Sequence, residues 1–211
     1  MTPSPSAGNA IIVGVTCFSE VDNCTVPTNG VTDNQGNTYN RIAEGESMTS
    51  STTHGARGYI FMAENIGTPS GSFIVSVDPN GAGPADNQHV AWGAIEVAGL
   101  ATPPCLDASG TTLVGNGTST TATTDLAITQ ANELAVGVLT MRSNDTNMLI
   151  TPEPNWTEHH THQNGASGPP GHSMVSKLLS GLGTVSHTWS HDAPTRGASA
   201  VIATFKGAAP N

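Results

Sequence analysis

Six of the eight histidines of this 211-residue chain lie between positions 159 and 191, and no other segment is so enriched in one reactive side chain. Neutral imidazole is the commonest side-chain ligand for zinc, copper and nickel. It is also the only group whose ordinary pKa lies near neutrality. The cluster therefore indicates a metal site or a proton-transfer site.

Side-chain alternation along strands predicts how part of the cluster is arranged. If the segments that flank the glycine-rich loop 163–171 pair as a hairpin, His162 and His172 meet at its mouth. His160 shares the face of His162, because side chains two residues apart in a strand point the same way. His159 points to the opposite face, beside Glu158 only if the strand bulges, so it is the least expected ligand of the run.

We predict five metal ligands, with zinc as the expected ion: His160, His162, His172, His187 and His191. A tetrahedral site needs three or four ligands, and a catalytic site leaves one position to water. Three alternatives remain open. The metal is structural, or it activates a water whose proton passes to Glu158 or Asp192, or the histidines are surface groups that hold no metal.

Other chemistry has little support in the sequence. There is no Gly-x-Ser-x-Gly elbow, no His-Glu-x-x-His pair and no phosphate-binding glycine loop, so we assign no catalytic residue. Trp156 and Trp189 flank the histidines and are candidates for stacking on a carbohydrate ligand. Trp92 belongs to an apolar segment and is expected in the core.

Composition excludes some partners. Charged residues make up 10% of the chain, against roughly 25% in ordinary soluble domains. The formal net charge is −10 with six Lys and Arg, so nucleic acids and anionic membranes are disfavoured. No apolar run approaches the about 20 residues that span a bilayer, which predicts no membrane insertion.

The chain has the pattern of a β protein throughout. Apolar and β-branched runs alternate with turn residues, and helical periodicity is missing. The stronger expected strands are 10–16, 58–63, 72–77, 89–97, 133–139 and 198–205, and the weaker ones are 38–43, 126–129, 156–162, 173–179 and 185–190. This pattern predicts one antiparallel two-sheet β-sandwich of about a dozen strands over 9–207, with a flexible segment 1–8 and a tail 208–211.

The three cysteines of the chain carry information on whether the protein is in an oxidising compartment. Cys17 and Cys24 are close enough to close a short loop, and a disulfide there would indicate an oxidising compartment. The alternative is a pair of free thiols. Cys105 is left unpaired.

Several turn and core motifs resemble an uncharacterised group of jelly-roll-like β-sandwich modules of secreted bacterial and phage-associated proteins. The resemblance covers most of the chain and rests on the segments 33–39, 63–65, 96–100, 132–137 and 200–205. It implies the fold and a secreted or phage context but assigns no catalytic residue, and the histidine cluster is not part of it.

These observations favour a non-catalytic module of an extracellular, cell-surface or virion protein. The expected role is adhesion, glycan binding or assembly with neighbouring subunits, with a divalent metal held by the histidines. The alternative is a metal-dependent hydrolase of the zinc type that uses the segment 159–191.

Overall fold

The computed structural model describes residues 4–19, 24–47, 56–79, 88–114, 117–141, 149–162, 171–192 and 197–208. All regular structure in these ranges is antiparallel β-strand. The all-β sandwich predicted from the sequence is therefore confirmed. Within the same ranges, no helix is long and apolar enough to cross a membrane.

Two larger sheets form the sandwich. The first is a four-stranded sheet in the order β3 (Asn40–Ser47), β4 (Ala56–Ala63), β1 (Ala10–Ser19) and β6 (Gln88–Val97). The second is a five-stranded sheet in the order β11 (Thr157–His162), β12 (Gly171–Leu178), β9 (Leu134–Met141), β14 (Ala198–Phe205) and β7 (Leu106–Val114). Ile12, Ile60, Val138 and Phe205 belong to the core between them.

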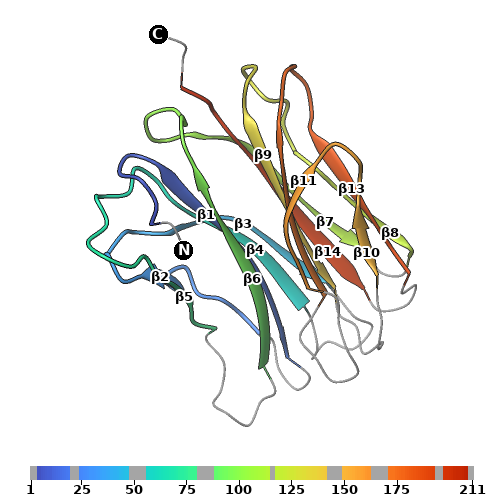
Figure 1. Cartoon of the computed structure of the whole chain (residues 1–211). Helices are drawn as coiled ribbons and strands as arrows, with labels where there is room; N and C mark the ends of the chain where they lie inside the picture. Colours follow the sequence, from blue (N-terminus) through green and yellow to red (C-terminus); the bar gives the residue numbers. More distant parts are fainter. Residues whose placement is uncertain are drawn as a thin grey trace.

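Two smaller sheets cover the outer faces of the sandwich. A three-stranded sheet of β10 (Ile150–Pro152), β13 (Ser186–His191) and β8 (Ser119–Thr123) packs on the five-stranded sheet. A two-stranded sheet of β2 (Val31–Asp33) and β5 (Val75–Val77) covers the four-stranded sheet. Figure 1 shows the resulting layers side by side, from β2 and β5 at the left to β8, β10 and β13 at the right.

This layering explains which strands are apolar along their whole length. Every residue of β1 and of β14 is buried, because each strand lies inside its sheet and that sheet is covered on both faces. In a strand with one solvated face, buried and exposed residues alternate instead, as they do in β8. Apolar core therefore lies on both faces of each of the two main sheets.

Glycines mark the places where the layers approach most closely. A Cβ added to Gly14 would lie 2.7 Å from a methyl of Val138 in the facing sheet. A Cβ on Gly137 would lie 2.9 Å from the indole of Trp189 on the opposite side of the five-stranded sheet. These glycines are structural, because they allow the close contact between the sheets.

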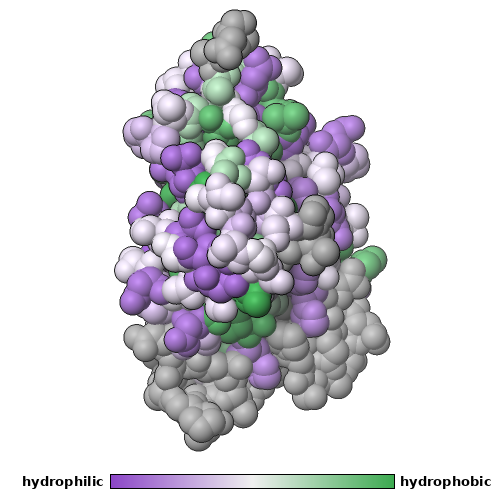
Figure 2. All heavy atoms as spheres, turned by 60° about the vertical axis from the view of Figure 1, so that its left-hand side comes forward, coloured by the Kyte–Doolittle hydropathy of each residue, from purple (hydrophilic) through white to green (hydrophobic). Residues whose placement is uncertain are grey.

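The surface of this fold combines polar and apolar residues. On the face shown in Figure 2, hydrophilic and intermediate residues cover most of the surface, and hydrophobic residues form small separate patches.

Residues 4–8, in the segment predicted to be flexible, are held by hydrogen bonds from Ser4 to Gly71, from Ser6 to Glu96 and from Gly8 to Ile66. Residues 1–3 of that segment and 209–211 of the tail lie outside the described ranges.

Candidate functional site

The hairpin predicted around the histidines is present. In the antiparallel pair of β11 and β12, His162 lies opposite His172 and His160 lies opposite Met174. Met174 packs in the core between the two main sheets, so this face of the hairpin points toward the four-stranded sheet. Apart from Gly171, the predicted connecting loop lies outside the described residues.

His172 is completely buried on that face. Its Nδ1 shares a hydrogen bond of 2.8 Å with the hydroxyl of Thr16 in β1, and its Nε2 has no partner. Burial, together with smaller effects of the neighbouring His160 and His162, lowers the pKa of His172 to about 3. The imidazole is therefore neutral at physiological pH.

His160 lies next to His172. The two ring centroids are 5.2 Å apart and the rings are inclined by 58°. Nδ1 of His160 is also buried without a hydrogen-bond partner. Burial lowers the pKa of His160, and His162 adds to this effect while Glu158 opposes it.

The position of His159 differs from the prediction. The register of β11 shifts between Glu158 and His160, so His159 is the extra residue of a β-bulge. Its Nε2 lies 2.7 Å from Oγ of Ser176, a residue on the same face of β12 as Met174. The bulge therefore turns His159 toward the side that His160 occupies, and not to the opposite face.

His187 and His191 lie on the other side of the five-stranded sheet. Both are buried residues of β13, and they share a face with Trp189 because side chains two residues apart in a strand point the same way. Trp189 donates its indole N–H to Oγ of Ser173. Ser173 and His172 are adjacent in β12 and point to opposite faces, so the sheet itself separates the two groups of histidines.

His187 is enclosed by aromatic rings. Its ring centroid lies 4.4 Å from that of Trp156 and 4.2 Å from that of Trp189. Both ring nitrogens lack a hydrogen-bond partner, and the nearest carboxylate oxygen, of Glu153, is 3.8 Å from Nδ1. Burial lowers the pKa of His187 to about 4, with a smaller contribution from Lys177. His191 shares a hydrogen bond with the hydroxyl of Thr120.

The five predicted ligands thus form two separate groups. Within the part of the chain that the structure describes, no three His, Cys, Asp or Glu side chains are arranged so that they hold one metal ion. Glu153 is near His187, while Asp192 accepts a hydrogen bond from the backbone N–H of Leu149.

Two of the three tryptophans, Trp92 and Trp189, differ from the sequence prediction in their burial. Trp189 is fully buried in the core and cannot stack on a ligand. Trp92, expected in the core, is 37% exposed because it lies on β6, the edge strand of the four-stranded sheet. Trp156 is partly buried, with Nζ of Lys177 5.9 Å from its ring centroid.

A pocket that the sequence did not reveal opens where the two main sheets separate at their edges. We call it the edge groove; it has a volume of about 290 Å³ and is lined by residues 95–100, Asn132, Leu134, His159, Ser176 and Leu178, among others. It brings together β6, β9, β11 and β12. No local sequence signal predicts it, because its walls come from five separate segments of the chain.

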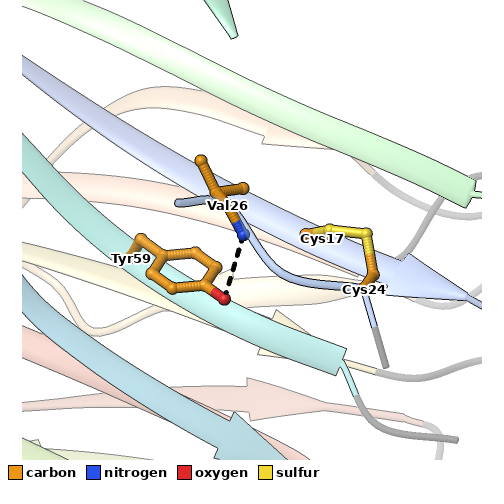
Figure 3. The surroundings of a disulfide bond; sticks show 4 residues. All are labelled: Cys17, Cys24, Val26 and Tyr59. Carbon is orange, nitrogen blue, oxygen red and sulfur yellow. Dashed lines mark hydrogen bonds between the residues drawn. A yellow bond between two sulfur atoms is a disulfide. The ribbon is translucent and has the colours of Figure 1, made fainter. Parts of the chain in front are cut away.

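A disulfide joins Cys17 and Cys24, and Cys105 is a buried free thiol. The bridge ties the end of β1 to the segment that follows, where the backbone N–H of Val26 donates to the hydroxyl of Tyr59 (Figure 3). Both cysteines belong to the core between the four-stranded sheet and β2–β5.

The fold and the site define an antiparallel β-sandwich protein with several buried histidines and a groove at the sheet edges. No family model matches the chain, and the comparisons with curated proteins and with solved structures find no significant similarity.

Proposed function

We propose that this chain is a non-catalytic β-sandwich module of an extracellular, cell-surface or virion protein and that it binds a glycan in the edge groove. The observation that carries the proposal is the groove itself, which combines an apolar floor with uncharged hydrogen-bonding groups. Sugar rings present apolar C–H faces and hydroxyls together, so such a surface suits them.

The groove has both kinds of group. Leu134 and Leu178 supply apolar surface, and Leu178 is 77% exposed. His159, Ser176 and Asn132 supply imidazole, hydroxyl and amide groups that donate to or accept from sugar hydroxyls. The short contact between His159 and Ser176 fixes both side chains before a ligand arrives, which lowers the entropic cost of binding.

Charge favours a neutral ligand. The chain carries a formal net charge of −10, and Glu96 is the charged side chain of the groove lining. An anionic ligand such as a phosphate or a nucleic acid would meet repulsion there.

The disulfide supports an oxidising compartment, because such bridges persist in secreted and virion proteins and are rare in the cytosol.

The buried histidines support a non-catalytic role. A metal-dependent hydrolase needs an open ligand position that substrate reaches, and His172, His187 and His191 all point into the protein interior.

A glycan array followed by calorimetry tests the proposal. Leu178→Ser should weaken binding of the selected glycan by about tenfold, because it removes apolar surface from the groove floor. Leu182→Ser is the matched control, since Leu182 is 71% exposed and is not part of the groove lining. If no glycan binds, or if both variants bind equally, the proposal is wrong. A stable oligomer in light scattering that Leu178→Ser dissociates would assign the groove to assembly instead.

A further inference from the structure

An amine and two carboxyl groups meet at one end of the five-stranded sheet, where β7 and β9 begin and β14 ends. Nζ of Lys206 lies 3.0 Å from Oδ1 of Asp107, whose side chain is only 3% exposed. Glu133 is completely buried, and neither of its carboxyl oxygens has a hydrogen-bond partner. None of these three residues belongs to the lining of the edge groove.

The backbone holds the amine against the carboxylate. The N–H of Lys206 donates to the carbonyl of Cys105, and the carbonyl of Lys206 accepts from the N–H of Ala101. Lys206 is therefore fixed on both sides of its own peptide. Two groups held in this way react with effective concentrations of about 10⁵–10⁸ M when their geometry is right, so a bond that fails to form between free molecules in water can form here.

The carboxyl group of Asp107 is surrounded by donors. The backbone N–H of Thr129 donates to Oδ2, and the hydroxyl of Thr129 donates to Oδ1. Burial alone would raise the pKa of Asp107, but hydrogen bonds from Thr129, Lys206 and Glu133 outweigh it and lower the pKa to about 2. The N–H of Thr129 is placed to stabilise the negative charge that develops on Oδ2 when a nucleophile adds to Cγ.

Glu133 can move the protons that such a reaction requires. Burial raises the pKa of Glu133, and the neighbouring Asp107 adds to this effect, because two buried carboxylates repel each other. The two carboxyl groups therefore share one proton, which resides on Glu133. A protonated Glu133 donates to Asp107, and this hydrogen bond gives a buried polar group the partner it otherwise lacks.

We propose that Lys206 and Asp107 join in a covalent amide bond between Nζ and Cγ, with Glu133 as the group that transfers the protons. Glu133 gives its proton to Asp107 and takes one from the ammonium, which frees the nitrogen lone pair. The N–C bond then forms, and the bond from Cγ to Oδ1 breaks. Oδ1 leaves as water with two protons that came from the ammonium, and Glu133 ends protonated as it began.

The bond would fasten the residue after β14 to β7. The side chain of Lys206 is 32% exposed, so the expelled water has a path to solvent. Like a disulfide, the bond closes a loop of the unfolded chain, here from residue 107 to residue 206, and so stabilises the fold. It forms independently of any ligand in the edge groove.

Intact mass spectrometry of the reduced, denatured full-length chain tests the proposal. We expect a mass one water below that of the sequence, and peptide mapping should find Asp107 and Lys206 in one cross-linked fragment. Lys206→Arg keeps a positive charge beside Asp107 but should restore the full mass, because a guanidinium stays protonated. Lys177→Arg is the matched control. Lys177 is the other lysine of the chain and its Nζ lies over the ring of Trp156, so the loss of water should persist.

Glu133→Gln tests the proton transfer. The amide keeps the shape of the side chain but does not relay protons, so the bond should form at least about 100-fold more slowly after refolding. An unchanged rate would overturn the role of Glu133. A native chain of full mass would overturn the bond itself and leave Lys206 and Asp107 as an ion pair, and this result needs no variant to fold. Loss of water that persists in Lys206→Arg would also overturn it.

Discussion

Gly93 in β6 and His160 in β11 lie against each other across the gap between the two main sheets. A Cβ added to Gly93 would lie 2.7 Å from the Cβ of His160. The absence of a side chain at position 93 therefore lets β11 approach β6 and brings the His160 ring to His172.

Gly93→Ala should consequently disturb the histidine pair. The added methyl forces His160 or its strand outward, which we expect to destabilise the fold by about 1–3 kcal/mol. Gly67→Ala is the control, because no atom lies within 4 Å of the position a Cβ would take there. Equal stability of the two variants in urea unfolding would refute the close contact.

Acid should destabilise the protein through His187. Its pKa is lowered to about 4 in the folded state, whereas in the unfolded chain it is about 6.5. The unfolded chain therefore binds the extra proton first, and stability is full above about pH 6.5 and falls as the pH decreases to about 4. The loss amounts to about 3 kcal/mol if the whole shift is expressed.

His187→Phe should remove this part of the acid sensitivity. Phenylalanine keeps an aromatic ring between Trp156 and Trp189 and eliminates two buried nitrogens that lack partners. We expect stability at pH 7 to be equal or higher by about 1–2 kcal/mol. Urea unfolding between pH 4 and 7 measures both effects, and a variant as acid-sensitive as the parent would exclude His187 as the cause.

The thiol of Cys105 should resist alkylation in the native protein. Burial raises its pKa to about 12, with the nearby Glu64 adding to the effect, so the reactive thiolate is scarce at pH 8. Iodoacetamide should label no cysteine in native, unreduced chain and Cys105 alone after denaturation. Labelling of Cys17 or Cys24 under the second condition would contradict the disulfide.

Replacing Cys17 and Cys24 together by Ala should lower stability by about 2–3 kcal/mol, because the bridge restricts a short loop of the unfolded chain. Chemical unfolding of the variant against the parent checks this value. The Cys105→Ala variant serves as a control for the loss of a buried sulfur. A double variant no less stable than this control would show that the bridge contributes nothing.

The sequence predicted the interior of the fold better than its margins. The runs 10–16 and 198–205 lie within β1 and β14, which are apolar throughout because both of their faces are covered. β7 and β8 escaped prediction because Thr, Ser and Gly dominate them, and β2 and β10 are three residues long. The weaker strand predicted at 126–129 is reduced to an isolated bridge between Ile128 and Gly183.

The candidate site was predictable only where local pairing determines it. The opposition of His162 and His172 follows from the hairpin alone. His187 is separated from these residues because it lies in a third layer, the sheet of β10, β13 and β8. No periodicity in the sequence predicts this layer. The same layer buries Trp189, whereas the edge position of β6 exposes Trp92.

The position of β14 has a consequence for the order of assembly. This strand is the last one in the described residues, yet it lies in the interior of the five-stranded sheet, hydrogen-bonded to β9 on one side and β7 on the other. These two strands cannot join until residues 198–205 have left the ribosome. We therefore expect nascent chains that end before β14 to remain protease-sensitive, and chains that include residues 198–205 to acquire protection in a single late step.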